Sequence, residues 1–286
     1  MNILVTGSRG QLGTEMQTLS RRVPEWNFSF FDLPELDIAD SSRVALAMDR
    51  CGCQVVINCA AYTAVDRAES EPDTAYRVNR DGAGVLARCA RDRGSLLVHV
   101  STDYVFDGLS CRPYIETDAP NPLGVYGRSK LEGELLIQSI APSHLIIRTS
   151  WLYSPYGQNF LNTMLRLGRE RERIDVVFDQ AGTPTRASDL AGAILDLLAK
   201  AEPEKQYAGL YHYSNEGVCS WYDFASAIMR LGKLPCRVYP IESSGYPTPA
   251  PRPAFSVLNK GAIKRDWGIG ITNWHDSLCE LLGQGR

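Results

Sequence analysis

Short apolar runs alternate with stretches of helical periodicity along the first 150 residues of the chain. Several of these runs are apolar throughout, which is typical of parallel strands covered on both faces. Between the first two runs, Leu12, Met16 and Leu19 recur with the i, i+4, i+7 spacing of one helix face. The alternation predicts an α/β fold, a Rossmann-type doubly wound parallel sheet, whose strands we expect at residues 3–6, 28–31, 55–58, 96–100 and 145–149.

The pattern becomes less regular after Thr149. Ser220 is a typical N-cap for a helix that Gly232 would end, and four prolines at alternate positions within residues 246–253 exclude a helix there. We predict a first domain over residues 1–150 and a smaller, mixed α/β domain over residues 151–286, some segments of which return to the first. The elements expected in the second part are helices at 157–171, 188–200 and 221–231 and a strand at 174–178.

Composition narrows the class of protein without indicating any chemistry. The chain has 286 residues, 44% hydrophobic and 22% charged, as an ordinary globular protein of about two domains does. Its 30 basic and 33 acidic residues give a net charge of −3, so we expect neither nucleic acid nor an anionic membrane as the main partner.

Location and metal content are constrained by what the sequence lacks. No apolar run approaches the ~18 residues of a membrane span, and the N-terminus lacks the basic segment and cleavage site of a secretory signal. The eight cysteines include no Cys-x-x-Cys pair and the four histidines show no metal-ligand spacing. We therefore expect a cytoplasmic protein and assign no metal ligand.

A glycine-rich segment directly follows the first predicted strand. Gly7, Gly10 and Gly13 recur at intervals of three residues just before the first predicted helix. Glycine permits the tight turn and lets a pyrophosphate approach the backbone, and the helix N-terminus then supplies N–H donors and a partial positive charge. The segment predicts dinucleotide binding.

The choice between NADH and NADPH stays open. Asp32 ends the second predicted strand, 19 residues after Gly13, near the ~20-residue spacing of an acid that binds the adenosine ribose, which favours NADH. Arg9 lies inside the glycine segment and could neutralise a 2′-phosphate, which favours NADPH. Use of both cofactors is compatible with these residues.

Three polar side chains form a candidate catalytic group. Tyr126 and Lys130 lie four residues apart, on one face of a predicted helix, and Thr102 follows a buried strand whose carboxyl end should face ligands. A tyrosine is a poor acid–base catalyst at neutral pH unless its pKa is tuned, and a nearby ammonium should lower that pKa. With Thr102 holding a carbonyl oxygen, the three predict a reductase that transfers hydride to a ketone.

The glycine segment and the Tyr-x-x-x-Lys pair resemble the extended short-chain dehydrogenase/reductase superfamily, and longer strings resemble one family within it, the dTDP-4-dehydrorhamnose reductases. The most specific string is STDYVFDG at residues 101–108. Others follow in order: NCAAYTAVD at 58–66, RTSW at 148–151, GQNF at 157–160, DQAGTPT at 179–185 and SWY at 220–222. The similarity covers nearly the whole chain.

The resemblance implies reduction of the 4-keto group of dTDP-4-dehydro-L-rhamnose to dTDP-L-rhamnose, with NADPH or NADH as cofactor and a dTDP-sugar as the main partner. It makes Tyr126 the proton donor, Lys130 the residue that tunes it and binds the nicotinamide ribose, and Thr102 the residue that orients the keto oxygen. It places the cofactor against Gly7, Gly10, Gln11, Leu12, Gly13, Asp32, Asp37, Ile38, Ala60, Ala61, Tyr62, Tyr126 and Lys130. It places the sugar against Thr102, Asp103, Tyr104 and Trp151 and the nucleotide against Asn159 and Arg186, whose guanidinium suits a diphosphate.

Asp32 and Asp37 compete for the adenosine end of the cofactor. Relatives bind magnesium at a dimer interface, so a homodimer is a possible assembly, but no compact acidic cluster in the sequence supports the metal. Among alternatives, a dehydratase needs an Asp-Glu pair after the threonine, whereas Tyr104 follows Asp103 here. Another nucleotide-sugar reductase or epimerase, and a non-catalytic subunit similar to the regulatory subunit of methionine adenosyltransferase, remain as alternatives.

Overall fold

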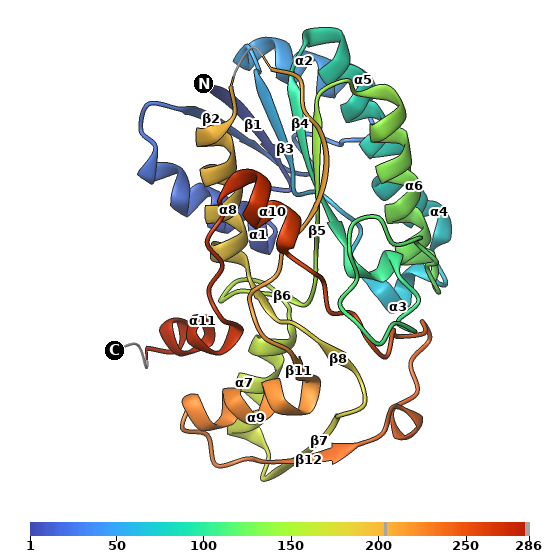
Figure 1. Ribbon diagram of the computed structural model, residues 1–286, viewed down its shortest axis with the longest axis vertical. Coiled ribbons are helices and arrows are strands. Elements are labelled where there is room, and N and C mark those ends of the chain that lie inside the picture. Colours follow the sequence, from blue (N-terminus) through green and yellow to red (C-terminus); the bar gives the residue numbers. More distant parts are fainter. Residues whose placement is uncertain (203–204, 284–286) are drawn as a thin grey trace.

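A six-stranded parallel sheet forms the centre of the larger lobe. The computed structural model describes residues 1–202 and 205–283, and its sheet has the strand order β10-β5-β4-β3-β1-β2 with every neighbouring pair parallel (Figure 1). The strands are β1 (Asn2–Thr6), β2 (Asn27–Phe31), β3 (Val55–Asn58), β4 (Leu96–Thr102), β5 (His144–Thr149) and β10 (Ala208–His212). The predicted doubly wound sheet is confirmed, and the order of its strands reverses between β1 and β3, where ligands bind in such folds.

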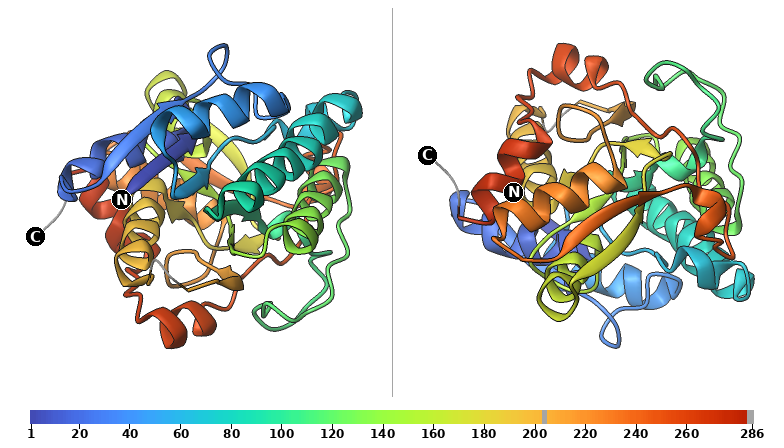
Figure 2. Two further views of the ribbon diagram at one scale, coloured as in Figure 1. Left: turned by 90° about the horizontal axis from the view of Figure 1, so that it is seen from above. Right: turned by 90° about the horizontal axis from the view of Figure 1, so that it is seen from below.

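Helices cover both faces of this sheet (Figure 2). Ile3 and Val5 of β1 pack against the α1 (Gln11–Leu19) and α8 (Ala187–Lys200) side, and Leu4 packs against the opposite side. That opposite side is formed by α2 (Ser41–Cys51), α5 (Ala83–Arg93) and α6 (Val125–Ile140). Because successive residues of a strand face opposite sides, uninterrupted apolar strands were the correct signal for a sheet buried on both faces.

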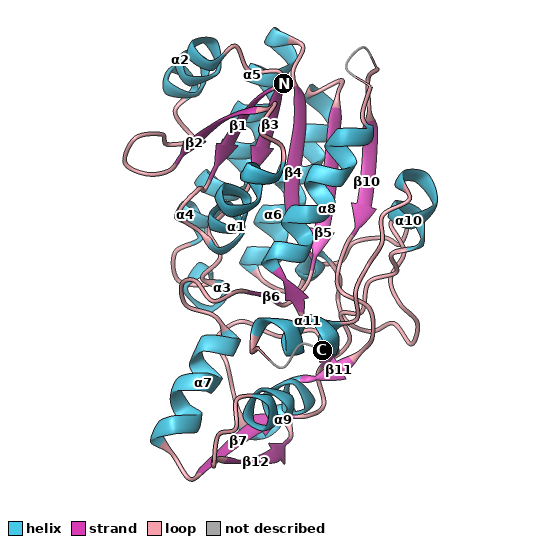
Figure 3. Cartoon of the chain, turned by 90° about the vertical axis from the view of Figure 1, so that its left-hand side faces the viewer, coloured by secondary structure: helices cyan, strands magenta, loops and turns pink. Residues whose placement is uncertain are grey.

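The smaller lobe lies beyond the carboxyl ends of β4 and β5 (Figure 3). Its core is built by α7 (Phe160–Glu170), α9 (Trp221–Leu231) and the parallel pair β7 (Arg173–Val177) and β12 (Arg237–Ile241). Ser220 and Asp223 form a reciprocal capping box that starts α9, as the sequence predicted for Ser220. Two-stranded pairs complete this lobe: β6 (Leu152–Tyr153) with β9 (Thr185–Arg186), and β8 (Ala181–Gly182) with β11 (Cys219–Ser220).

The chain passes between the lobes several times. After β9, α8 returns to the sheet and β10 adds its edge strand, and Ile263 of α10 (Gly261–Trp267) joins the same core as Leu190 of α8. α11 (Trp274–Leu281) lies at the junction (Figure 1). The remaining short elements are η1 (Ser20–Arg22), α3 (Val65–Ala68), α4 (Pro72–Tyr76), η2 (Arg77–Gly82), η3 (Asp103–Val105) and η4 (Ser243–Gly245).

Some predicted boundaries differ from those observed. The helix expected at 157–171 begins only at Phe160. Gly157 has a φ of +68°, which is not helical, and Asn159 is the N-cap, because its side chain accepts a hydrogen bond from the Asn162 N–H. The expected strand at 174–178 is β7, one residue earlier, and the segment 246–253 contains no helix. Residues 284–286 of the predicted second domain lie outside the described part of the chain.

Candidate active site

The glycine segment turns directly from β1 into α1. Gly7 has a φ of +66°, and a Cβ built on it would lie 2.5 Å from the Ala60 nitrogen, so only glycine fits this contact. A Cβ on Gly13 would lie 2.2 Å from the Gly7 carbonyl oxygen. The N-cap residue of α1 is Gly10, which offers no side-chain cap. The N–H groups at the start of this nine-residue helix are therefore suited to a pyrophosphate, and the loop fits a dinucleotide.

Asp32 lies against the glycine segment, whereas Asp37 is turned toward α4 and η2. The Asp32 carboxylate accepts hydrogen bonds from the Arg9 and Leu33 N–H groups, both at 2.8 Å. Burial opposes ionisation of Asp37, but the Ala39 N–H and the Arg77 guanidinium lower its pKa below the ordinary value. Asp32 is therefore the carboxylate that contacts the glycine segment directly.

The Arg9 side chain is paired with an acid on the next loop. Its guanidinium donates to Glu35 Oε1 at 2.6 Å and to the Leu33 carbonyl at 2.8 Å. Both partners of the ion pair are more than half exposed, and such surface pairs contribute about 0–1 kcal/mol. Arg9 can exchange Glu35 for a phosphate at little cost in free energy.

The other residues assigned to the cofactor line the same edge of the sheet or support it from inside. Ala60 contacts Gly7, and Tyr62 is fixed by a backbone N–H donated to Asn79 Oδ1 (2.8 Å). Leu12 and Ile38 are buried core residues on opposite faces of the sheet. Gln11 lies at the start of α1 and Ala61 between Ala60 and Tyr62.

Thr102 and Tyr126 meet at the carboxyl end of β4. Thr102 ends the strand, 5% exposed, and its hydroxyl donates to Asp103 Oδ1 at 3.0 Å and lies beside the Tyr126 phenol. Tyr104 lies edge-on to Tyr126, with ring centroids 5.5 Å apart. The structure therefore brings together Thr102, Asp103, Tyr104 and Tyr126, which the sequence placed on two separate motifs.

The expected lowering of the Tyr126 pKa by Lys130 is wrong in this structure. Burial raises the pKa of Tyr126 to about 12, the hydrogen bond from Thr102 opposes this only partly, and the charge of Asp103 adds to the increase. Desolvation penalises the phenolate more than its neighbours stabilise it. At neutral pH Tyr126 is a protonated phenol, which is the form of a proton donor.

Lys130 is one of the most deeply buried charged residues of the protein, 2% exposed. Its Nζ donates to the Val100 carbonyl at 2.7 Å and lies 3.2 Å from His99 Nε2. Burial lowers the pKa of Lys130 to about 8, although Glu134 and Cys59 raise it. His99 of β4 lies in contact with Lys130, and Asn58, at the end of the neighbouring strand β3, contacts His99 in turn.

Asp103 is a second buried acid beside the phenol. Burial raises its pKa to about 7, and the nearby Ser256 and Thr102 hydroxyls partly oppose this increase. Its Oδ2 is buried without a hydrogen-bond partner among the described residues. A buried oxygen that lacks a partner is costly, so Asp103 is ready to bond a hydroxyl group that enters the site.

The small lobe contributes an aromatic wall. Trp151 adopts a φ of +47° and stacks on Trp221 with ring centroids 3.5 Å apart. A Cβ on Gly182 would lie 2.5 Å from the Trp151 ring, so the indole is held from both sides. A left-handed tryptophan is strained, and such strain is common at functional sites.

Asn159 and Arg186 have different surroundings. Asn159 Nδ2 donates to Gln11 Oε1 at 2.8 Å and so connects the small lobe with the start of α1. The Arg186 guanidinium pairs with Glu280 at 3.2 Å, and its backbone N–H donates to Asn215. The charge that the sequence assigned to a diphosphate is therefore already paired, at the junction with α11.

Arg252 is a residue near the site that sequence reasoning missed. It forms an ion pair with Asp66 at 2.8 Å and lies over the Tyr104 ring, 6.0 Å from its centroid. The Ala250 N–H also donates to Asp66. The segment 246–253 of the small lobe is thereby attached to α3 of the sheet lobe. The sequence could not indicate this role of Arg252, because its partner Asp66 lies more than 180 residues away along the chain.

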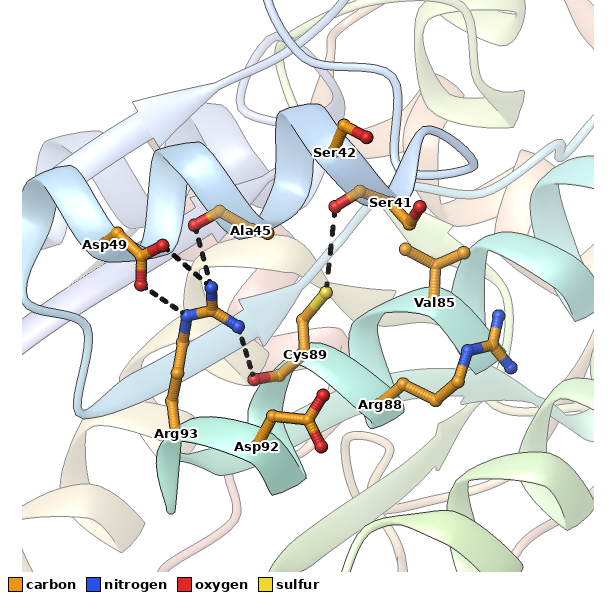
Figure 4. A pocket seen from close by; sticks show the side chains of 9 residues that line it. All are labelled: Ser41, Ser42, Ala45, Asp49, Val85, Arg88, Cys89, Asp92 and Arg93. Carbon is orange, nitrogen blue, oxygen red and sulfur yellow. Dashed lines mark hydrogen bonds and ion pairs between the residues drawn. The ribbon is translucent and has the colours of Figure 1, made fainter.

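A separate surface hollow lies between α2 and α5 (Figure 4). Its volume is about 600 Å³. Arg93 crosses it and donates to the Asp49 carboxylate and to two carbonyl groups. Its lining residues are Ser41, Ser42, Ala45, Asp49, Val85, Arg88, Cys89, Asp92 and Arg93. The hollow lies on one face of the sheet lobe, away from the carboxyl ends of the strands, and holds none of the predicted site residues.

Two general features of the described residues bear on partners. None of the described helices combines the length and the apolar run that crossing a bilayer requires. Across the described ranges, no three His, Cys, Asp or Glu side chains gather closely enough to hold a metal ion.

The fold and this edge of the sheet define a class of protein. A glycine turn into a helix N-terminus, beside a Thr–Tyr pair backed by a buried lysine on α6, is the arrangement of an extended short-chain dehydrogenase/reductase. Within that class, the chain belongs to the family described as "RmlD substrate binding domain", whose model matches residues 1–286. The resemblance seen in the sequence is confirmed.

Individual relatives agree over the full length of the chain. A dTDP-4-dehydrorhamnose reductase of Sinorhizobium fredii is 40% identical, over 99% of this chain and 97% of the relative. The crystal structure of such a reductase from Clostridium acetobutylicum is similar with a TM-score of 0.93 and 39% identity over 99% of both chains. One from Bacillus anthracis, solved in complex with NADP, has the same TM-score and 37% identity, over 99% of this chain and 98% of the other.

Proposed function

We propose that this protein is a dTDP-4-dehydrorhamnose reductase: with NAD(P)H it reduces the 4-keto group of dTDP-4-dehydro-L-rhamnose to give dTDP-L-rhamnose. The observation that carries the proposal is the placement of Tyr126 beside Thr102 at the carboxyl end of β4, in a chain 40% identical to a reductase of that name. The reaction belongs to the supply of dTDP-rhamnose for surface polysaccharide, and we place it in the cytoplasm.

The residues of the chain account for the proton half of the reaction. When bound, NAD(P)H supplies the hydride that the carbonyl carbon accepts. The Thr102 hydroxyl and the Tyr126 phenol bond the keto oxygen, and Tyr126 gives it the proton that completes the alcohol, because its raised pKa keeps the phenol protonated until charge develops on that oxygen. Lys130 lies one helical turn from Tyr126 and would hold the nicotinamide ribose.

The glycine segment would hold the cofactor pyrophosphate. Gly7, Gly10 and Gly13 leave the start of α1 open to it, and Asp32 is the better placed acid for the adenosine ribose, while Asp37 is occupied by Arg77. Because the Arg9–Glu35 ion pair is exposed and weak, Arg9 can turn to a 2′-phosphate. We therefore propose that both NADH and NADPH are used.

The small lobe would bind the dTDP-sugar. Trp151 and Tyr104 would line the sugar pocket, and Asp103 has an oxygen that could accept from a sugar hydroxyl. Asn159 would contact the nucleotide part from the start of α7, and Arg186 could do so only by leaving Glu280. This divides the chain into a cofactor part over residues 1–150 and a mainly substrate-binding part over residues 151–286. A homodimer stays a prediction.

The direct test is turnover of purified protein with dTDP-4-dehydro-L-rhamnose. We expect the nicotinamide absorbance to decay with NADPH and with NADH, and NMR of the product to identify dTDP-L-rhamnose. A product with the opposite configuration at C4 would indicate another nucleotide-sugar reductase. Cofactor binding with no oxidation in the presence of the keto-sugar would favour the non-catalytic subunit, the second candidate.

A further inference from the structure

The start of helix α6 is capped by a side chain from a distant segment. Its N-cap residue, Gly124, has no side chain with which to bond the free N–H groups of the first turn. The carboxylate of Glu69, 56 positions earlier in the chain, takes this place, because its Oε1 accepts from the Val125 N–H at 2.8 Å. Val125 is the first residue of α6 and Tyr126 is the second. A hydrogen bond from outside the helix therefore lies one residue away from the phenol of the site.

Glu69 projects from a packed segment of the sheet lobe. It is the C-cap of α3, and α4 begins three residues later at Pro72. Ala68, the residue before it, is fully buried and belongs to an apolar cluster with Ala75 of α4 and Val125 of α6. The backbone that carries Glu69 thus packs against the start of α6, so the cap is part of a fixed contact between the two segments.

The side chain of Tyr126 packs on the same apolar cluster. The rings of Tyr62 and Tyr76 also lie against it, and the Tyr62 hydroxyl is itself fixed by donating to Glu71 Oε2 at 2.6 Å. The segment over residues 62–76 therefore supports Tyr126 in two ways: the cluster packs against its ring, and Glu69 holds the backbone one residue before it.

The cap gives a reason for the glycine at position 124. Gly124 has a φ of −120°, which any residue can adopt, so its backbone conformation does not require glycine. A Cβ built on Gly124 would lie 2.6 Å from Glu69 Oε1, whereas the next nearest atoms, Glu69 Cδ and Pro251 Cδ, lie at 3.8 and 3.9 Å. The contact that a side chain at position 124 would disturb is therefore the cap itself.

We propose that Glu69 is a positioning residue for the reaction: by holding the first N–H of α6 it sets the place of the Tyr126 phenol beside Thr102. A carboxylate suits this position, because the N-terminus of a helix has free N–H donors and a partial positive charge. The inference rests on the proposed function, in which the phenol must reach the keto oxygen. Glu69 acts through the helix and not on the substrate.

The effect of losing the cap should fall on proton transfer. Tyr126 lies in the first turn of α6, which frays when its N–H groups lose their partners. Lys130 lies one turn further along and is held by its own hydrogen bond to the Val100 carbonyl at 2.7 Å. We therefore expect the phenol to be displaced while the lysine and the glycine segment keep their places, so that kcat falls and cofactor binding does not.

The first test compares two substitutions at one position. Glu69→Ala removes the acceptor, and we expect kcat to fall roughly 10–100-fold, since a displacement of about 1 Å can have that effect, with the Kd for NADPH unchanged. Glu69→Gln keeps an amide oxygen that can accept from the Val125 N–H, so it should restore most of kcat. Equal losses in the two variants, or full kcat in Glu69→Ala, would overturn the proposal.

The second test displaces the carboxylate without removing it. Gly124→Ala places a methyl group where Glu69 Oε1 lies, so kcat should fall about as it does in Glu69→Ala. The double variant should lose no more than either single variant, because both substitutions remove one contact, whereas independent effects would multiply. Multiplied losses would contradict the cap.

Asp40→Ala is the matched control. Asp40 Oδ1 accepts from the Arg43 N–H at 3.0 Å and so caps α2, a helix that carries none of the proposed site residues. This variant should lower the urea midpoint, as a lost cap does, and leave kcat unchanged. A fall in kcat as large as that of Glu69→Ala would attribute the loss to general destabilisation and refute the role of Glu69.

NMR of the protein without ligands separates this inference from the proposed function. The Val125 N–H should be protected from hydrogen exchange in the parent protein and in Glu69→Gln, and should exchange faster in Glu69→Ala. The carbon-13 signals of the Tyr126 ring should shift in Glu69→Ala and return in Glu69→Gln. These results hold or fail even if the parent protein turns over no keto-sugar, which would refute the proposed function alone. An unprotected Val125 N–H in the parent, or ring signals that Glu69→Ala does not move, would overturn the inference.

Discussion

A tyrosine can serve hydride chemistry as an acid or as a base, and burial decides between the two at Tyr126. The pKa of the phenol is raised to about 12, while neighbouring Asp103 has a pKa raised to about 7. Tyr126 is therefore protonated near neutral pH, whereas Asp103 is only about half protonated there, so the site contains a proton donor before substrate enters. This suits reduction of a ketone, in which the oxygen gains a proton.

Tyr126→Phe removes this proton donor and leaves the ring and its contact with Tyr104 in place. We expect kcat to fall by about 10²–10⁴-fold, the usual contribution of a general acid, with the Kd for NADPH unchanged. Turnover followed by nicotinamide absorbance and cofactor binding followed by fluorescence check the two halves. Turnover near that of the parent protein would remove Tyr126 from the mechanism.

At the scale of single residues, the sequence predicted those site residues that are recognisable from their neighbours along the chain. Tyr126 and Lys130 share one helix, and Thr102 follows a strand, so pattern and position were enough. The meaning of His99 and Asn58 depends on the register of β3 against β4, which no spacing in the sequence contains. The lowered pKa expected for Tyr126 failed because burial, the larger effect, cannot be measured from sequence.

Among the elements, α6 carries most of the chemistry and must pack very closely to deliver it. A Cβ on Gly127 would lie 2.2 Å from the Tyr104 carbonyl oxygen, so the helix contacts η3 backbone to backbone. This close approach sets the distance between Tyr126, the preceding residue of α6, and Thr102. The helix interior thus accepts a residue of poor helix propensity at the point where the site is assembled.

Gly127→Ala should separate α6 from η3. We expect activity to fall by roughly 100-fold, because a displacement of about 1 Å is enough for that, and the free energy of unfolding to fall by about 1–3 kcal/mol. Gly192→Ala is the matched control in α8, since nothing lies within 4 Å of its Cβ. It should stabilise the protein by about 0.5–1 kcal/mol. Equal effects of the two substitutions would contradict the packing argument.

The same helix is attached to β5 by a buried ion pair. Glu134 and Arg148 are 1% and 3% exposed at their side chains. Glu134→Gln leaves a buried guanidinium without its counter-charge, so we expect the free energy of unfolding in urea to drop by about 3–5 kcal/mol. Glu170→Gln breaks the exposed pair with Arg166 on α7 and should cost less than about 1 kcal/mol. A loss at Glu134 as small as that at Glu170 would show that Arg148 is not held by charge.

For the molecule as a whole, the sequence predicted the sheet but not its full extent. Five strands were identifiable because they are rich in apolar residues, and four of them, β1, β3, β4 and β5, are almost wholly buried. β10 escaped notice because only His212 of its five residues is buried, as befits an edge strand. Because α8 and β10 bring the chain from the small lobe back to the sheet, the two lobes are connected by several chain crossings. Contacts between them, such as that of Gln11 with Asn159, join residues 148 positions apart. Such long-range contacts are invisible to local patterns.

The interlaced fold buries titratable groups, and these should govern its stability in acid. Burial lowers the pKa of His212 to about 3 and that of His99 well below its ordinary value, whereas in the unfolded chain both titrate near 6.5. Between these values the unfolded state binds more protons, so the free energy of unfolding falls as the pH falls through this window. Asp103, Glu116 and Glu15, whose pKa values are raised, act in the opposite direction. The total slope is therefore a difference between opposing groups, and a single histidine must be removed to isolate its share.

His212→Gln removes one proton that unfolding would take up. Whatever its effect on stability at neutral pH, the slope of the free energy of unfolding against pH, measured by urea denaturation between about pH 5 and 6, should flatten by about 1 kcal/mol per pH unit. Ser214→Ala changes a buried neighbour that does not titrate, so it should lower stability without altering the slope. If the curves of unfolding free energy against pH are parallel for the parent protein and His212→Gln, His212 is protonated in the folded state. That result would contradict the lowered pKa expected from its burial, edge-on to Phe106 and beside Arg148.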